Sequence, residues 1–191
     1  MLRVLLVNDT NKQVGRLRAA LIQAGCEIVE EVTSALMIPK KVAELRADIV
    51  IIDTESPSRD VLEQICVVTQ DAPRPIVMVS EDTQPSAIKA AIKAGVSAYV
   101  VEDIDKHRLG AVLEIAQARF EMDQSLMQQI RQAESRLNER KVVERAKGLL
   151  MQLRSMTESE AYHAMRKIAM DRNIRILDVA QKLLSMNELL A

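Results

Sequence analysis

The sequence has few cysteines and no long apolar run, which excludes several classes of protein. Its two cysteines, Cys26 and Cys66, form neither a CxxC motif nor a cluster with histidine, so no zinc site is indicated. We expect both thiols to be buried and reduced. No run of eighteen apolar residues could span a bilayer, and the opening MLRVLLVNDT lacks the features of a signal peptide. We therefore expect a cytoplasmic protein without a membrane segment.

Motifs for catalysis are also missing. The sequence shows no arrangement of serine, histidine and aspartate for nucleophilic attack and no glycine-rich phosphate loop, and His107 and His163 are isolated. No internal repeat or low-complexity segment stands out among the 191 residues. We expect a protein of one or two domains that is not an enzyme.

What is present over the first hundred residues is an alternation of two kinds of segment. Short apolar runs rich in β-branched residues occupy residues 2–7, 27–32, 48–53, 75–80 and 98–101. Amphipathic stretches with helical spacing occupy residues 11–25, 59–70 and 85–94. Nearly continuous apolar strands are typical of a parallel sheet buried on both faces, with helices as the connections. The pattern predicts a five-stranded, doubly wound α/β domain, which binds ligands at the carboxyl ends of its strands.

A long helix should follow. Between residues 105 and 154 there is no proline, and good helix formers dominate. Apolar residues recur in steps of three and four, including Leu126, Ile130, Ala133 and Leu137. Because this stripe is narrow, it suits a coiled-coil homodimer better than a globular core, with docking onto the same chain as the alternative.

The last fifty residues predict a small all-α domain. Thr157 and Glu160 have the spacing of a capping box, and helices should cover residues 158–171 and 175–185, where apolar residues recur at helical spacing. With the end of the long helix they form a three-helix bundle. From residue 139 onward, ten basic and seven acidic residues give a net charge of +3, against −4 for the remainder. This imbalance is a mild indication of a polyanionic partner.

Polar side chains end three of the predicted strands. Asp9 follows the first strand, Asp53 ends the third and Ser80 ends the fourth. In a parallel sheet these ends lie side by side, and carboxylates brought together need a cation to neutralise them. Oxygen ligands suit Mg²⁺, beside which a carboxylate can attack a phosphoryl group. A nearby hydroxyl can then donate a hydrogen bond to the phosphate.

The order and spacing of these residues resemble those of two-component receiver domains. In that family an acidic pair follows the first strand, a phosphoacceptor aspartate the third, and a serine or threonine the fourth. Here Asn8 and Asp9 occupy the acidic pair, Asp53 the phosphoacceptor position, and Ser80 and Tyr99 the switch positions. The resemblance covers residues 1–117 and implies a receiver domain with Asp9 and Asp53 as weak Mg²⁺ ligands.

Two positions depart from the receiver pattern. Asn8 replaces an acidic residue, which should lower the metal affinity. Glu102 stands where the family has a lysine that pairs with the phosphoryl group, and a glutamate there would repel a phosphate. Two interpretations stay open. In the first, Asp53 is phosphorylated and switches the output. In the second, the domain is a structural or protein-binding module that does not depend on phosphorylation. The change at residue 102 favours the second interpretation.

The C-terminal segment resembles the ANTAR domain of antitermination regulators. The resemblance is carried by residues 144–151 (ERAKGLLM), 160–162 (EAY), 165–166 (MR) and 169–170 (AM). It implies binding to paired hairpins of a nascent leader RNA, which prevents a terminator from forming. Tyr162 has the spacing of a core residue, with stacking on a base as the alternative. The candidate RNA contacts are Arg145, Lys147, Tyr162, Arg166, Lys167, Arg172 and Arg175.

These resemblances divide the chain into four parts. They are a receiver domain over residues 1–117, a coiled-coil linker helix over 118–138, an ANTAR domain over 124–184 that overlaps the linker, and a tail over 185–191. Segments such as VNDT, IDTESP and MNELLA resemble the NasT-like branch of the family. That resemblance implies leaders of nitrate and nitrite assimilation operons as targets, and an inhibitory nitrate-sensing protein (NasS-like) as partner.

Two other functions compete with this interpretation. A phosphorylation-controlled regulator could bind DNA through a helix-turn-helix, although residues 174–185 offer only Arg175, Gln181 and Lys182 as possible readers of bases. A protein-interaction module without nucleic-acid binding is compatible with the modest charge of the C-terminal part. The ERAKGLLM resemblance argues against the second.

Overall fold

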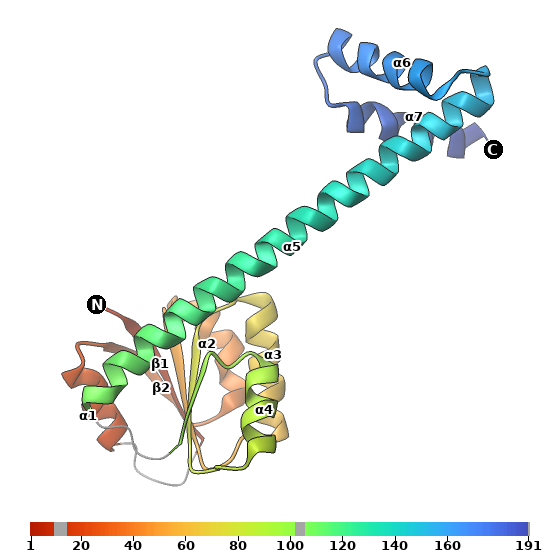
Figure 1. Ribbon diagram of the computed structural model, residues 1–191. Coiled ribbons are helices and arrows are strands. Elements are labelled where there is room, and N and C mark those ends of the chain that lie inside the picture. The colour runs from red at the N-terminus through yellow and green to blue at the C-terminus, as the bar shows by residue number, and fades with distance from the viewer. Residues whose placement is uncertain (10–14, 102–105, 191) are drawn as a thin grey trace. The chain divides into compact units, whose positions relative to one another are not determined.

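The computed structural model describes residues 1–9, 15–101 and 106–190, with the side chains of 106, 107 and 188–190 excepted. The chain divides into two compact units, residues 1–124 and 125–191, and a single helix runs through both (Figure 1).

The first unit is built on a five-stranded parallel sheet, as predicted. Its strands pair in the order β2-β1-β3-β4-β5. The bounds are β1 Arg3–Asp9, β2 Glu27–Val32, β3 Ile49–Thr54, β4 Ile76–Ser80 and β5 Ala98–Val101. The central strand β3 is buried almost throughout, which explains its unbroken apolar run.

Helices cover both faces of this sheet. Their bounds are α1 Gly15–Gln23, α2 Ile38–Leu45, α3 Arg59–Asp71, α4 Pro85–Ala94 and α5 Lys106–Arg154, with a 3₁₀ turn η1 over Ala35–Met37. One apolar core packs η1, α2, α3 and α4 against one face. A second packs α1 and the first turns of α5 against the other. The doubly wound α/β architecture is therefore confirmed.

Local signals explain several helix ends. The Ser58 hydroxyl accepts a hydrogen bond from the Val61 N–H and caps α3. Pro85 begins α4, and Gly95 ends it with φ of 112°, a backbone conformation that glycine adopts without strain. Of the two thiols, Cys26 is buried as expected, but Cys66 is exposed on α3, so that expectation was wrong.

The second unit is a three-helix bundle. The end of α5 packs against α6 (Glu158–Asp171) and α7 (Ile176–Leu190), and α7 extends beyond the predicted end at residue 185. Its buried core consists of Ala146, Met165, Ala169, Val179 and Ala180. The predicted capping box forms: Thr157 accepts from the Glu160 N–H, and the Glu160 carboxylate accepts from the Thr157 N–H.

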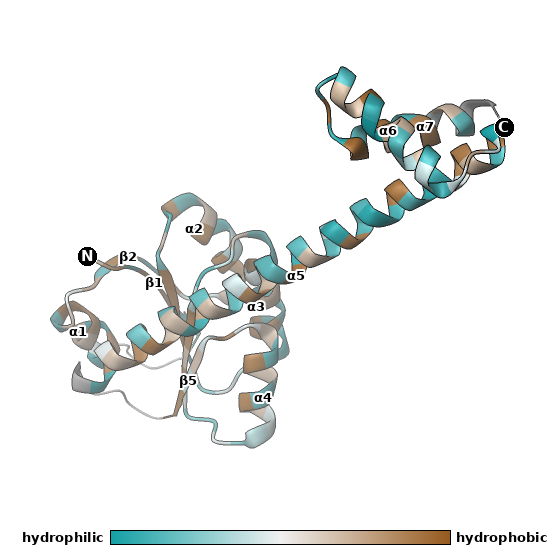
Figure 2. Ribbon diagram, turned by 45° about the horizontal axis from the view of Figure 1, so that its top comes forward, coloured by the Kyte–Doolittle hydropathy of each residue, from teal (hydrophilic) through white to brown (hydrophobic). Residues whose placement is uncertain are grey.

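The middle of α5 lies apart from both cores. Every residue from 121 to 141 is exposed, and Figure 2 shows this stretch as mostly hydrophilic turns interrupted by apolar residues. Among the described residues, no helix combines the length and the apolar character needed to cross a membrane.

Candidate functional sites at the sheet edge and on α6

The structure brings the predicted strand-end residues together at one edge of the sheet. In the register of the parallel strands, Asn8 on β1 pairs with Asp53 on β3, and Asp9 pairs with Thr54. Thr54 pairs in turn with Ser80 on β4. Two carboxylates, an amide and two hydroxyls therefore gather at the carboxyl ends of three neighbouring strands, where doubly wound sheets bind ligands.

The carboxylates of this edge are only partly accessible to solvent. Asp9 and Asp53 are half-buried, and burial raises the pKa of the Asp9 carboxyl. Asp53 makes an interaction of its own within the chain. No cluster of three or more acidic, histidine or cysteine side chains suited to a metal ion occurs among the described residues. Two carboxylates nevertheless fit Mg²⁺, because that ion keeps several waters and commonly takes one or two carboxylates.

The two predicted switch residues are held by the loop after β4. The buried Ser80 hydroxyl donates to the Glu55 carbonyl (3.0 Å) and accepts from the Asp82 N–H (3.2 Å). The Tyr99 hydroxyl donates to the Asp82 carbonyl (2.9 Å). For Ser80 to donate to a phosphate, its bond to Glu55 would first have to break.

Sequence reasoning missed the residue that organises this loop. The Asp82 carboxylate accepts from the Ser56 hydroxyl (2.6 Å) and from the Gln84 N–H (2.8 Å), and these two bonds lower the pKa of Asp82. The network ties the loop after β3 to the loop after β4. An aspartate three residues before a helix, whose carboxylate can accept from the backbone N–H two residues further on, is a turn signal that could have indicated the bond to Gln84. Glu102, the residue at the lysine position, lies outside the described residues.

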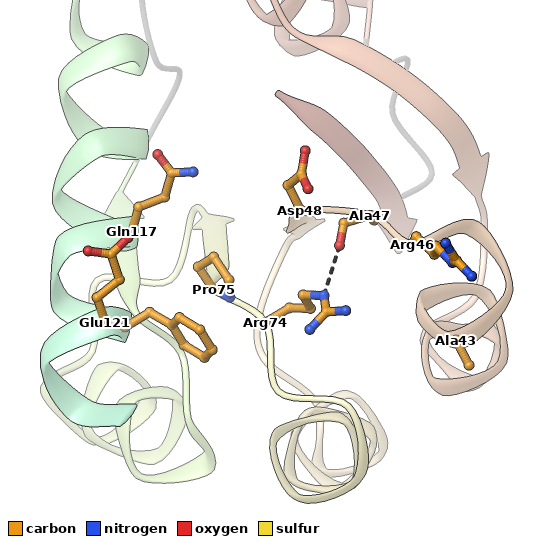
Figure 3. A pocket seen from close by; sticks show the side chains of 9 residues that line it. Ala43, Arg46, Ala47, Asp48, Arg74, Pro75, Gln117 and Glu121 are labelled. Carbon is orange, nitrogen blue, oxygen red and sulfur yellow. Dashed lines mark hydrogen bonds between the residues drawn. The ribbon is translucent and has the colours of Figure 1, made fainter. Parts of the chain in front are cut away.

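A polar pocket opens at the opposite edge of the same sheet (Figure 3). It measures about 620 Å³ and is lined by Arg46, Asp48, Arg74, Gln117 and Phe120, among others. The Arg74 guanidinium points toward the Ala47 carbonyl and donates to it (3.0 Å). Two arginines and two acidic residues line the pocket, so the formal charges balance and indicate no charged ligand.

In the second unit, Lys147, one of the candidate RNA contacts, is buried. Only 7% of the residue is exposed, and its ammonium group lies 2.8 Å from a Glu144 oxygen and 2.7 Å from a Glu158 oxygen. These two hydrogen bonds raise the pKa of Lys147, the bond to Glu144 contributing most. The lysine thus joins α5 to the start of α6, and its charge is neutralised within the bundle.

Tyr162 is not the core residue that its spacing suggests. Its side chain lies on the outer face of α6, where the residue is 41% exposed. Its ring meets that of His163 edge to face, with centroids 6.3 Å apart. The inward positions of α6 are occupied by Ala161, Met165 and Ala169 instead.

Cationic residues continue this outer face. Arg166 and Lys167 are both exposed and line one shallow depression of about 290 Å³ together with His163, Met170 and Asp171. Adjacent residues on a helix are offset by about 100°, yet both cations border this one surface. We call Tyr162, His163, Arg166, Lys167 and Met170 the α6 face.

The other candidate RNA contacts differ in whether their charges are already paired within the chain. Arg145 on α5 and Arg172 at the end of α6 are exposed, and neither has an ion-pair partner within the described ranges. Arg175 is exposed but pairs with Asp178 (3.4 Å). Free cations are the better candidates for contact with a polyanion, because no internal pair must be broken.

Both units match known domain families. Residues 4–114 match the response regulator receiver domain, and residues 131–184 match the ANTAR domain. Both are regulatory domains. The receiver match covers the sheet-edge site, and the ANTAR match contains Lys147 and the whole α6 face.

Several known proteins are similar to this chain. The transcriptional regulatory protein PdtaR of Mycobacterium tuberculosis is 33% identical over 183 residues, which cover 95% of this chain and 89% of PdtaR. The nitrate regulatory protein of Klebsiella oxytoca is 41% identical over 66 residues, which cover 35% of this chain and 17% of that protein. A signal receiver domain of a diguanylate cyclase from Desulfovibrio desulfuricans, 18% identical, shares the fold with a TM-score of 0.55 over 63% of this chain and 97% of its own.

Proposed function

Because this chain belongs to the response regulators, with a receiver domain followed by an ANTAR domain, we propose that it binds hairpins of a leader RNA and acts as a cytoplasmic transcription antiterminator. The α6 face is the observation that carries the proposal. It combines a tyrosine and a histidine with Arg166 and Lys167, two exposed cations without an ion-pair partner among the described residues.

The chemistry of this face suits RNA hairpins. Loops display unstacked bases, on which an aromatic ring or a guanidinium group can stack. Tyr162 offers such a ring, and Arg166 offers both a plane and a charge. Lys167 would neutralise a phosphate and thereby release counterions, which makes binding sensitive to salt. Arg145 and Arg172 extend the cationic surface, whereas Lys147 supports the bundle from inside.

A nitrate-related target is supported by one relative. The nitrate regulatory protein of Klebsiella oxytoca is similar to this chain over 66 residues, 35% of this chain's length. Together with the NasT-like segments of the sequence, this favours leaders of nitrate and nitrite assimilation operons. We propose that an inhibitory nitrate-sensing protein (NasS-like) holds the regulator inactive and releases it when nitrate is present.

Control by a partner protein fits the sheet-edge site. Asn8 reduces the negative charge that would hold Mg²⁺ at Asp9 and Asp53, and Glu102 replaces the lysine that would pair with a phosphate. Ser80 already donates its hydroxyl to Glu55. When bound, Mg²⁺ would supply positive charge between the two carboxylates. We propose that RNA binding does not require phosphorylation of Asp53.

The exposed stripe of α5 supports a homodimer as the active form. Leu126, Ile130 and Leu137 lie on the surface with 54%, 44% and 54% of each residue exposed. A helix pair would cover these side chains. Two bundles in one dimer could then bind the two hairpins of one leader, which raises affinity through effective concentration without a new kind of contact.

The decisive experiment is an RNA-binding titration of the full chain without a phosphodonor. A fluorescent two-hairpin leader RNA and duplex DNA of the same sequence are titrated at several salt concentrations. We expect tight, salt-dependent binding to RNA and weak binding to DNA. Preference for the duplex would instead support the DNA-binding alternative, and binding to neither, with or without phosphodonor, would support the protein-interaction module.

Variants connect this result to the α6 face. The double variant Arg166→Ala/Lys167→Ala should weaken RNA binding by roughly tenfold or more and reduce the salt slope by about one per lost phosphate contact. The matched control is Lys89→Ala/Lys93→Ala, which removes the same charge from exposed positions of α4. Equal effects of the two doubles would show that net charge alone matters.

Two further variants separate stacking and phosphorylation from charge. Tyr162→Leu should weaken binding while Tyr162→Phe preserves it, because a phenyl ring retains the stacking surface. Asp53→Ala should bind RNA as the native chain does. A strong loss with Asp53→Ala, or a large gain on adding acetyl phosphate to the native chain, would contradict control without phosphorylation.

A further inference from the structure

The exposed stripe of α5 is apolar in its centre and charged at both ends. Leu126, Ile130, Ala133 and Leu137 follow one another in steps of four, three and four residues. This is the spacing of the inward positions of a coiled coil. All four residues are exposed.

The same spacing continues into charged residues on both sides. Before Leu126 it reaches Asp123 and then Arg119, and after Leu137 it reaches Arg140 and then Glu144. All four charged residues are exposed. Of these, Glu144 faces Lys147 of its own chain. Read along the helix, each end therefore carries a basic residue followed by an acidic one.

A parallel pair of helices would bring like charges together. In a parallel pair each inward residue meets its own copy, so Asp123 would face a second aspartate and Arg140 a second arginine. Arg119 would likewise face a second arginine, and Glu144 a second glutamate. At the flanking positions, Arg136 would also lie beside the partner's Lys141. Such contacts between like charges disfavour the parallel arrangement.

An antiparallel pair converts these contacts into attractive ones. When the twofold axis passes between residues 131 and 132, Asp123 faces the partner's Arg140 and Arg119 faces the partner's Glu144. Because of the twofold symmetry, each contact occurs twice in the dimer.

The apolar residues match in the same register. Leu126 meets the partner's Leu137, and Ile130 meets the partner's Ala133, so each layer contains at least one large aliphatic side chain. A single register thus satisfies the apolar and the charged positions together.

We propose that α5 pairs with α5 of a second copy of this chain in the antiparallel orientation, centred between residues 131 and 132. The orientation rests on the proposal that the regulator is a homodimer. The apolar layers supply most of the affinity, since partly exposed ion pairs contribute little. The charged ends select the orientation by opposing the parallel alternative.

Disulfide trapping in the full chain tests the orientation directly. Both native cysteines are first replaced (Cys26→Ala, Cys66→Ser), and Leu126→Cys and Leu137→Cys are then introduced into separate chains. We expect an equal mixture of the two chains to form a 126–137 cross-link under mild oxidation, whereas Leu126→Cys alone forms none. In the antiparallel register, two copies of residue 126 lie eleven residues apart along the axis, or roughly 16 Å, which is too far for a disulfide.

Charge exchange provides a second measurement that needs no cysteine. Asp123→Arg alone should weaken dimerisation by roughly tenfold in Kd, because it faces the partner's Arg140 twice. Adding Arg140→Asp to the same chain should restore it, as sedimentation equilibrium can show. In a parallel dimer, Asp123→Arg would exchange one like-charge contact for another and leave Kd nearly unchanged.

The outcomes separate this proposal from the proposed function. A 126–126 cross-link, or no rescue by the second substitution, overturns the antiparallel orientation. A chain that stays monomeric at all concentrations overturns the pairing as well. RNA binding is measured on the same variants with a single hairpin, so a monomer that binds this hairpin leaves the RNA-binding proposal intact.

Discussion

At the scale of single residues, Lys147 shows that a basic residue in a nucleic-acid-binding domain can serve the fold. Its ammonium group is enclosed by Glu144 and Glu158, so contact with a phosphate would require one of these pairs to break. The hydrogen bond from Lys147 lowers the pKa of Glu158. The Glu158 carboxylate therefore stabilises the bundle above its ordinary pKa, and this contribution is lost as the pH falls through the lowered value.

The substitution Glu158→Gln tests this contribution. At neutral pH we expect a small decrease in the melting temperature, because the exposed carboxylate is well screened. Once the pH has fallen below the lowered pKa of Glu158, the native glutamate is protonated as well, and the difference from the native chain should vanish. The control Glu139→Gln changes the same charge at an exposed position. A difference that persists in acid would mean that the ion pair is not its cause.

Gly148 supports a second prediction at this scale. The ERAKGLLM motif suggests that this glycine allows close packing of helices, yet no described atom lies within 4 Å of where its Cβ would stand. Gly148→Ala should therefore raise the free energy of unfolding by about 0.5–1 kcal/mol. As a contrast, Gly95→Ala should destabilise, since its φ is 112° and its Cβ would meet the Thr69 hydroxyl at 2.5 Å. Urea unfolding measures both, and destabilisation by Gly148→Ala would refute the prediction.

At the scale of elements, the start of α6 depends on its capping box. Thr157 and Glu160 satisfy each other's backbone N–H groups, and the first turn also carries Glu158, the partner of Lys147. Thr157→Ala should destabilise the bundle by about 1 kcal/mol, whereas Thr157→Ser should retain the cap. Hydrogen exchange should show the loss first in the α6 amides. Equal protection in the native and alanine chains would contradict this role.

The elements show what the sequence alone could predict. Strong periodicity or a cap identified the strands and α6, whose predicted range of 158–171 matches the structure. The helix over Ile38–Leu45 was not recognised, although Ile38, Val42 and Leu45 have helical spacing and Pro39 suits the first turn of a helix; it is only eight residues long. Tyr162 was wrongly favoured as a core residue. Its spacing of three residues from Met165 is compatible with the buried face of the helix and also with the edge of that face, where side chains reach solvent. The bond between Asp82 and Gln84 has a local turn signal, but the bond between Ser56 and Asp82 depends on two loops meeting in space, which no local pattern encodes.

At the scale of the whole molecule, one continuous helix links the receiver domain to the RNA-binding candidate. α5 contributes Leu109, Leu113 and Ala116 to the core of the first unit and Ala146 to that of the second. Its exposed middle then remains available to a second copy of the chain. The orientation of that copy determines how far apart the two bundles stand, and hence which leader RNAs a dimer can bind with both.

The orientation of the dimer determines which spacing between two RNA hairpins allows both bundles to bind. Val142, which packs against the bundle core, would lie level with residue 121 of the partner in the antiparallel register. The two copies of Val142 would thus stand 21 residues apart, or roughly 32 Å along the axis, whereas in a parallel dimer they would lie side by side. Two hairpins joined by a minimal linker should then bind only as tightly as one hairpin. Lengthening the linker should increase the affinity by roughly 10²–10⁴ once both bundles are reached. Titration of the native dimer with two-hairpin RNAs of increasing linker length measures this affinity. Full affinity with the shortest linker would instead require the two bundles to be adjacent, as in a parallel pair.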